Sequence, residues 1–310
     1  MSNILIIKHG SLGDLIQANG AINDIKNSFK NSKVILLTTS PYIKLMSECP
    51  YIDGVIEDRR LPRWNIFYLI KLKKLLLRYN FIKIFDLQNS SRTNFYKKFI
   101  LNKIEWSTSE SALLSNQKKK DFDKEPVLER MRLQLNMSNV PTNYIFNFDL
   151  SWALKDLSRL LKQYTNGEFI LIFPFSSNKH INKRWPYFKE LVTRIKKHYK
   201  NKYSILVAPG PGEIIEAKNF NAKVIIDEDR PLNLNQLITL INNAKYIISN
   251  DTGPAHIASH LKKKGLVLFG SHTSPKKVSI ENNYFKSLQS KNLPDLKVQE
   301  VFNEIKNNLD

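Results

Sequence analysis

The stretch Ser249-Asn-Asp-Thr-Gly-Pro-Ala-His-Ile-Ala-Ser259 determines the fold that we predict for this chain. It follows the apolar run Lys245-Tyr-Ile-Ile248, a pattern typical of a buried strand that leads through polar residues into a helix. Open α/β sheets form ligand sites where such strands end. Gly253 lets a ligand approach the backbone closely, and Pro254 suits the first helical turn. The free N–H groups of a helix start favour a phosphate, although an ordinary capped helix fits this segment equally well.

Strands and helices alternate in both halves of the chain, which predicts two α/β domains with parallel sheets. In the first half we expect strands at 3–8, 33–39, 55–56 and 81–86, and helices at 15–29, 41–49, 67–79 and 126–137. In the second half we expect strands at 169–173, 203–208, 223–226, 246–249 and 265–270, helices at 152–164, 234–243 and 294–309, and a helix that ends at 199. Residues 103–125 are polar and irregular, which is compatible with a lid or with a disordered insertion.

The composition favours a packed globular protein without an internal disulfide. The 310 residues suffice for two cores, and 42% of them are hydrophobic. The single cysteine, Cys49, gives no indication of an oxidising compartment. The amino-terminal apolar run is too short for a signal peptide, and no apolar run is long enough for a transmembrane helix. We therefore expect a cytoplasmic protein.

The net charge of +20, from 48 basic and 28 acidic residues, favours an anionic partner. Nucleic acid, an acidic membrane surface and a phosphorylated substrate are the candidates, and a lysine-rich composition with no partner explains the charge equally well. The helix expected at 67–79 interleaves basic residues with Leu and Ile. Such a helix either packs on the sheet with its cationic side chains reaching solvent or lies on a membrane surface.

Polar residues follow two strands of the first half. The loop His9-Gly-Ser-Leu-Gly-Asp14 lacks the third glycine of the dinucleotide fingerprint. Asp14 can cap the next helix, or it can present a carboxylate at the carboxyl edge of the sheet, where reacting groups lie. For an acceptor pocket, the candidates are Gly10, Ser11, Gln88, Asn89 and Arg92.

Four motifs occur in one order along the chain: Ile7-Lys-His-Gly-Ser-Leu-Gly-Asp14, Lys183-Arg-Trp-Pro186, Pro209-Gly-Pro-Gly-Glu213 and Asn250-Asp-Thr-Gly-Pro-Ala-His-Ile-Ala258. As a set, over nearly the whole chain, they resemble the ADP-heptose:lipopolysaccharide heptosyltransferases, which are family 9 glycosyltransferases. The resemblance implies a GT-B fold, with two Rossmann-like, doubly wound domains facing a central cleft. We assign 1–160 to an acceptor domain, 161–293 to a nucleotide-sugar donor domain, and 294–310 to a helix that returns toward the first domain.

The resemblance also implies roles for individual residues. Asp14 matches the catalytic aspartate of the family and would act as general base. Lys183 matches the phosphate-binding lysine, whose point charge suits a departing diphosphate. Glu213 matches the acidic residue that accepts hydrogen bonds from the ribose. The remaining donor-binding candidates are Ser176, Asp251, Thr252, Gly253 and His256.

The expected function is an inverting transfer of heptose from ADP-heptose to a lipopolysaccharide inner-core acceptor. We expect neither a metal nor another cofactor, because the carboxylates lack ligand spacing and lysine with helix amides can replace a cation. The enzyme would be cytoplasmic or peripheral at the inner face of the cytoplasmic membrane. The alternatives are a transferase of this fold with another nucleotide sugar or acceptor, a basic nucleic-acid-binding protein, and a nucleotide-sugar epimerase or dehydrogenase.

Overall fold

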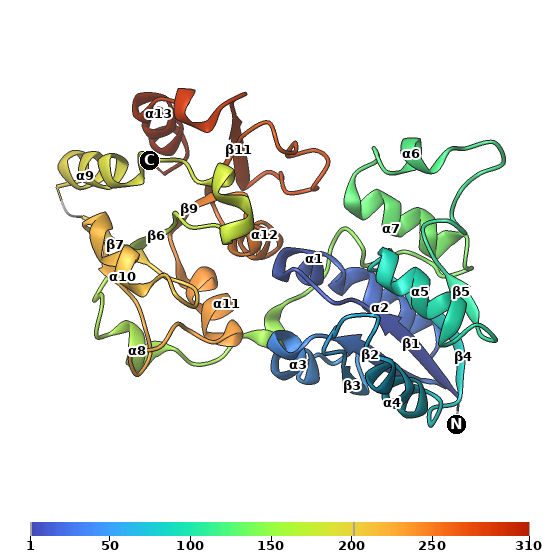
Figure 1. Cartoon of the computed structure of the whole chain (residues 1–310). Coiled ribbons are helices and arrows are strands. Elements are labelled where there is room, and N and C mark those ends of the chain that lie inside the picture. Colours follow the sequence, from blue (N-terminus) through green and yellow to red (C-terminus); the bar gives the residue numbers. More distant parts are fainter. Residues whose placement is uncertain (1, 201, 310) are drawn as a thin grey trace. The chain divides into compact units, whose positions relative to one another are not determined.

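The chain folds into two compact units, Met1–Trp152 and Ala153–Asp310, each built around a parallel sheet (Figure 1). The computed structural model describes residues 2–200 and 202–309. The boundary that we predicted at residue 160 falls inside the second unit. The cleft that we expect between the domains stays a prediction.

Unit 1 contains a five-stranded sheet of order β3-β2-β1-β4-β5. Its strands are β1 (Asn3–Ile7), β2 (Lys33–Thr38), β3 (Gly54–Glu57), β4 (Phe81–Asp86) and β5 (Glu105–Ser107). The chain order reverses between β1 and β4, where Ile7 lies beside Asp86. Ligands bind at such a switch point in open parallel sheets, and the loops after β1 and β4 both start there.

Helices cover both faces of the unit 1 sheet. They are α1 (Leu12–Gln17), α2 (Asn19–Ser28), α3 (Ser40–Ser47), α4 (Ile66–Leu76), α5 (Ser91–Phe99), α6 (Lys119–Phe122) and α7 (Val127–Asn136). On one face, Leu72 of α4 and Tyr96 of α5 pack in one cluster with Leu5 of β1. Ile6, the next residue of β1, points to the opposite face of the sheet and is also fully buried, and the helices α2 and α7 contact each other. Both faces of the sheet are therefore covered, as in a doubly wound fold.

Unit 2 contains a six-stranded sheet of order β11-β10-β9-β6-β7-β8. Its strands are β6 (Phe169–Phe173), β7 (Ser204–Val207), β8 (Lys223–Val224), β9 (Tyr246–Asn250), β10 (Gly265–Phe269) and β11 (Phe285–Gln289). If β6 to β11 are numbered 1 to 6 and the sheet is read from β8, the order is 3-2-1-4-5-6, the order of dinucleotide-binding folds. The switch point lies between β6 and β9, so the loop after Phe173 and the start of the next helix after Asn250 emerge together.

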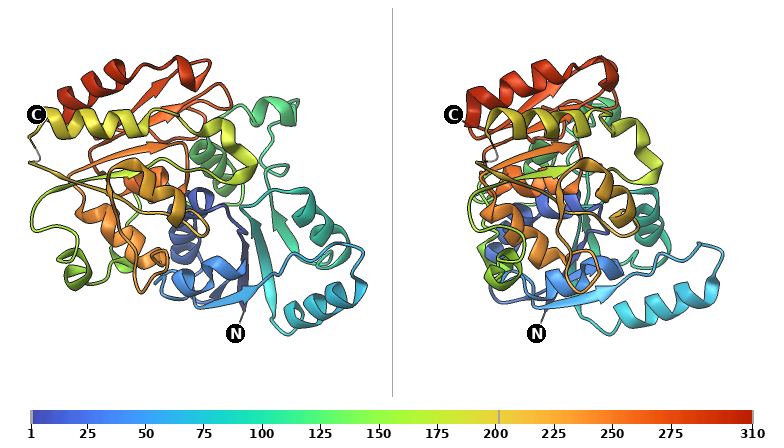
Figure 2. Two further views of the ribbon diagram at one scale, coloured as in Figure 1. Left: turned by 60° about the vertical axis from the view of Figure 1, so that its left-hand side comes forward. Right: turned by 90° about the vertical axis from the view of Figure 1, so that its left-hand side faces the viewer.

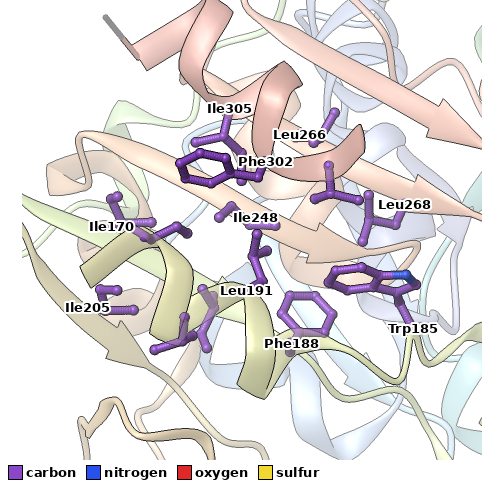
Figure 3. Packing of buried hydrophobic residues seen from close by; sticks show 14 of the residues in the cluster. Ile170, Trp185, Phe188, Leu191, Ile205, Ile248, Leu266, Leu268, Phe302 and Ile305 are labelled. Carbon is purple, nitrogen blue, oxygen red and sulfur yellow. The ribbon is translucent and has the colours of Figure 1, made fainter. Parts of the chain in front are cut away.

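The helices of unit 2 are α8 (Ser158–Leu161), α9 (Phe188–His198), α10 (Ile214–Ala217), α11 (Leu234–Asn243), α12 (Gly253–His260) and α13 (Val298–Leu309), with short 3-10 turns at Asn178–Lys183, Lys218–Phe220 and Leu293–Asp295. A further 3-10 turn, Ser151–Ala153, spans the boundary between the two units. Figure 3 shows α9 and α13 packed on one face of the sheet, with Phe188 and Phe302 beside Ile248. Val301 and Ile305 of α13 are fully buried in the core of unit 2. The return of the last helix toward the first domain stays a prediction.

Two edge strands and three helices depart from the predicted pattern: α5 and α6 were not predicted, and the helix expected at 152–164 forms only in part. The irregular loop predicted at 103–125 contains β5, which pairs with β4, and α6. The strand β11 at the other sheet edge was not predicted, and only α8 forms inside the helix predicted at 152–164. Short edge strands are partly exposed and therefore show little apolar periodicity. Among residues 2–200 and 202–309, no helix combines the length and the apolar character needed to cross a membrane.

Candidate active site

In unit 2, the last residue of β9 holds the neighbouring loops in place. Asn250 is fully buried, its side-chain nitrogen donates to the carbonyl of Pro174 at 2.7 Å, and its side-chain oxygen accepts from the N–H of Trp185 at 3.1 Å. Trp185 is 2% exposed, and its indole N–H donates to the carbonyl of Leu296 at 2.9 Å. The segment that carries Lys183 is thereby fixed against the end of β9.

Asp251 is the centre of an ionic cluster. Its Oδ2 accepts a hydrogen bond from Lys183 Nζ at 2.7 Å and lies 2.9 Å from His272 Nε2, and its Oδ1 lies 3.8 Å from His256 Nε2. Burial alone would raise the pKa of Asp251, but the hydrogen bond and charge of Lys183, together with the two histidines, hold this pKa below its usual value. Asp251 therefore stays ionised at neutral pH and holds Lys183 and His272 together.

The cluster adjoins the amino end of α12. Thr252 is the N-cap residue with extended backbone angles, and Gly253 and Pro254 begin the helix. The first N–H groups of a helix have no carbonyl partner within it, and the positive end of the helix dipole attracts anions. With the Lys183 ammonium and the His272 imidazole at the same helix end, this arrangement suits a diphosphate.

Ser176 lies in the loop after β6, which pairs with β9, and Glu213 lies in the turn after β7, which pairs with the other side of β6. Glu213 Oε2 accepts from the N–H of Gly210 at 2.7 Å, which closes the turn after β7, and burial raises the pKa of this carboxyl. The ends of β9 and β7 are two strand spacings apart, roughly 10 Å. Ser176 is buried, and its hydroxyl donates to the carbonyl of His180 at 2.7 Å, so it shapes the loop after β6.

In unit 1, Asp14 lies in the first turn of α1, directly after the loop that follows β1. Its Oδ2 accepts from the N–H of Ser11 at 2.9 Å and from the Ser11 hydroxyl at 3.0 Å. Gly10 has φ +111°, and a Cβ on it would lie 2.4 Å from the ring of Tyr42, so only glycine fits there. Asp14 is half-buried, so its carboxylate is accessible at this edge of the sheet.

A buried network beneath the same loop is centred on Asp58. This fully buried carboxylate lies 2.9 Å from His9 Nε2 and accepts from the hydroxyls of Tyr68 at 2.5 Å and Tyr96 at 2.7 Å. Burial opposes ionisation, but the contacts with His9 and the tyrosines hold the pKa of Asp58 well below its usual range. The network fixes His9, which immediately precedes Gly10.

The polar atoms of the predicted acceptor residues after β4 are bonded within unit 1. Gln88 Oε1 accepts from the N–H of His9 at 2.9 Å. Asn89 donates to Gln134 at 3.0 Å and accepts from the N–H of Ser109 at 2.7 Å. Arg92 donates to Tyr96 at 2.6 Å and to the carbonyl of Leu61 at 2.6 Å. A polar cavity of about 160 Å³ lies beside these residues and is lined by Asn89, Asn94, Lys97 and Lys119 among others.

The family model of glycosyltransferase family 9 (heptosyltransferase) matches residues 69–306, which is more than half of the chain. The chain belongs to glycosyltransferase family 9. It is therefore a glycosyltransferase, and its two parallel-sheet α/β units are those of the GT-B fold.

Known proteins similar to this family 9 glycosyltransferase include relatives by sequence and by structure. Lipooligosaccharide heptosyltransferase 2 of Campylobacter jejuni subsp. jejuni serotype O:6 is 26% identical over 95% of both chains. The E. coli heptosyltransferase WaaC with ADP has a TM-score of 0.73 at 16% identity, covering 99% of this chain and 100% of that one. A family 9 glycosyltransferase from Veillonella parvula has a TM-score of 0.75 at 15% identity, covering 99% and 97%. These structural likenesses show the common fold.

The structure brings together some of the predicted site residues of this glycosyltransferase and adds others. Lys183, Asp251 and His256 form one cluster, and Thr252 and Gly253 begin the adjoining helix. The sequence analysis missed His272, whose only signal is its position directly after the strand at 265–270. Lys8, which follows β1 in the first motif, is buried and donates to the carbonyl of Leu87 at 2.8 Å. In the part of the chain that the structure describes, no three His, Cys, Asp or Glu side chains are grouped as a metal ion would need.

From the buried position of Asp58 we predict that this residue contributes to the stability of the folded chain. Asp58→Asn leaves His9 and two tyrosines around a neutral amide, so we expect the free energy of unfolding to fall by about 3–5 kcal/mol at neutral pH. The pKa of Asp58 is lower in the folded than in the unfolded chain, so its stabilisation exists above about pH 4 and is lost on acidification below it. The variant should therefore show a weaker loss of stability on acidification than the wild type.

Chemical denaturation followed by circular dichroism at several pH values measures this effect. Glu129→Gln, which removes a partly exposed pair with Arg132 on α7, is the matched control and should cost at most about 1 kcal/mol. An Asp58→Asn variant as stable as Glu129→Gln would contradict the role assigned to the buried network.

Proposed function

We propose that this family 9 glycosyltransferase transfers heptose from ADP-heptose to the inner core of lipopolysaccharide with inversion at the anomeric carbon. The observation that carries the proposal is the cluster of Lys183, Asp251 and His272 at the start of α12, which has the charge and the donors to hold a diphosphate. The match to the family model, which is described as heptosyltransferase, supports heptose as the transferred sugar. The name of the Campylobacter relative supports an acceptor of the lipopolysaccharide class.

In the proposed reaction, the Asp14 carboxylate accepts the proton of the acceptor hydroxyl as its oxygen attacks the anomeric carbon. The bond between that carbon and the diphosphate oxygen breaks, and ADP leaves with the electron pair. A single displacement of this kind inverts the configuration. The reaction requires Asp14 to approach the anomeric carbon of a donor held by unit 2.

The charge that develops on the departing ADP is met by Lys183 and the N–H groups at the start of α12. We therefore propose that the reaction proceeds without a metal ion. Glu213 accepts hydrogen bonds from the ribose hydroxyls in this scheme. The location at the inner membrane face follows from the proposed acceptor, a lipid-anchored and anionic glycolipid.

A screen of nucleotide sugars with a heptose-lacking lipopolysaccharide core as acceptor tests the proposal. We expect ADP-heptose alone to give a product one heptose heavier by mass spectrometry, and nuclear magnetic resonance to show the inverted anomeric configuration. A product made from another nucleotide sugar would move the assignment to a transferase of the same family with a different donor. Retention of configuration would exclude direct attack assisted by Asp14.

A further inference from the structure

Unit 1 exposes an apolar surface around α4 that the proposed reaction does not use. We call it the α4 surface, and define it by Leu61, Trp64, Ile66, Phe67, Ile70 and Leu77 together with the basic residues of 59–78. Trp64 is 80% exposed and Phe67 is 89% exposed. Of the fifteen exposed large hydrophobic side chains in the described chain, six lie in residues 61–77. Both views of Figure 2 show α4, drawn in cyan, at the periphery of unit 1.

The opposite side of α4 is firmly attached to unit 1. Leu72 and Leu76 are buried in the core cluster of the sheet, and the Tyr68 hydroxyl reaches Asp58 at 2.5 Å. The Asn65 side chain caps the helix by accepting from the N–H of Tyr68 at 3.0 Å. Because α4 already covers its part of the core, the exposure of Phe67 and Ile70 does not result from a loosely packed helix.

The charge of the α4 surface is of one sign. Residues 59–78 include seven arginines and lysines and no aspartate or glutamate, and the basic residues are Arg59, Arg60, Arg63, Lys71, Lys73, Lys74 and Arg78. Within residues 2–200 and 202–309, Lys71, Lys74 and Arg78 form no ion pair. Phe67, Ile70, Lys71 and Lys74 follow one another at helical spacing, so apolar and cationic side chains share one stripe.

We propose that the α4 surface docks the enzyme on a bilayer that contains anionic phospholipids. Tryptophan and phenylalanine side chains favour the interface between headgroups and acyl chains, and flanking lysines and arginines attract anionic headgroups. A second copy of this chain does not fit, because a symmetric contact would place two cationic faces against each other. A protein partner fits less well, because apolar and basic residues alternate here and do not form an apolar centre with a polar rim.

Docking through α4 would bring the enzyme to its proposed acceptor, which is held in a membrane. Only this biological reason for docking rests on the proposed function; the docking itself is argued from the α4 surface. The surface belongs to the same unit as Asp14, the base proposed to act on the acceptor. The test below uses neither donor nor acceptor. Its failure would therefore leave the transferase proposal untouched, and a failed transferase assay would leave the docking result intact.

Cosedimentation of the full chain with vesicles tests the docking. We expect binding to vesicles of phosphatidylcholine mixed with phosphatidylglycerol, weak binding to phosphatidylcholine alone, and release by salt. Trp64→Ser combined with Phe67→Ser removes the inserting side chains, and Lys71→Glu combined with Lys74→Glu reverses two charges. Each double variant should lower the partition coefficient at least about tenfold.

Matched controls come from exposed residues of unit 2. Ile215→Ser removes an 83% exposed apolar side chain of α10, and Lys189→Glu with Lys197→Glu reverses two charges on α9. Both controls should bind like the wild type, and thermal melting should be unchanged in all variants. Equal binding to neutral and anionic vesicles, or equal losses in test and control variants, would overturn the proposal. Dimerisation through the α4 surface, abolished by the Trp64 and Phe67 substitutions, would also overturn it.

Fluorescence gives a second readout that needs no destabilising change. Trp64 is 80% exposed, whereas Trp106 and Trp185 are 9% and 2% exposed and Trp152 is partly buried. We expect a blue shift of the emission on anionic vesicles and quenching by brominated lipid, both lost in Trp64→Phe while cosedimentation persists. Cosedimentation without any change in Trp64 emission would place the contact elsewhere on the molecule.

Discussion

We expect Asp14→Asn to lower the turnover of the proposed heptosyl transfer by about 10²–10⁴-fold, the range that a positioned general base contributes, and to leave the affinity for ADP unchanged. The asparagine has the shape of aspartate, and its side-chain oxygen can still accept the hydrogen bonds that Asp14 receives from Ser11. The substitution therefore removes the basic carboxylate and retains the start of α1. Transfer rates at saturating donor and isothermal titration with ADP measure the two quantities.

Ser11→Ala is the matched control for Asp14, because it deletes the hydroxyl bonded to the carboxylate but leaves the carboxylate itself. We expect it to retain most of the activity. Near-normal turnover of Asp14→Asn would remove Asp14 from the role of base. An equal loss in both variants would indicate that Asp14 acts through the structure of the loop after β1.

We expect Lys183→Ala to weaken ADP binding by about ten- to hundredfold, because a hydrogen bond between charged groups contributes about 1.5–3 kcal/mol. The lysine is the cationic partner of Asp251 and lies beside the start of α12, where we place the diphosphate. Isothermal titration with ADP and with adenosine separates the effect on the phosphates from any effect on the nucleoside. Adenosine binding should be unchanged.

Two further variants define the specificity of this effect. Lys179→Ala removes an exposed lysine from the same 3-10 segment and should leave ADP binding unchanged. His272→Ala should weaken ADP binding as well, because His272 shares the Asp251 carboxylate with Lys183. Equal affinities of wild type and Lys183→Ala would exclude the diphosphate site. A normal affinity of His272→Ala alone would restrict the site to Lys183 and the helix end.

Most of the fold was predictable from the sequence, because its central strands are buried on both faces and read as uninterrupted apolar runs. The runs at 81–86 and 169–173 coincide with β4 and β6. The edge strands β5 and β11 are short or partly exposed, so they carry no such signal. The spacing of apolar residues in α13 predicted a helix with one buried face. That spacing does not indicate which of the two domains the face packs against.

The site was predictable only where its residues lie inside short motifs. Asp251, Thr252 and Gly253 follow a strand directly, so their place at the sheet edge is a local property of the sequence. The pairing of Asp251 with Lys183 and His272 joins three separate segments, and the sequence alone did not reveal His272. Asp58 was missed for the same reason, since its partners His9 and Tyr96 come from other elements.

The contact between Lys183 and Asp251 has a consequence for the kinetics of the proposed donor site. In the absence of a donor, the Lys183 ammonium is already paired with the Asp251 carboxylate. An incoming diphosphate must share the lysine or take it from Asp251, so its net gain in free energy is smaller than that of a phosphate meeting an unpaired charge. The same carboxylate recaptures the lysine when ADP departs. Asp251 would thus moderate product affinity and shorten the time that spent nucleotide stays bound.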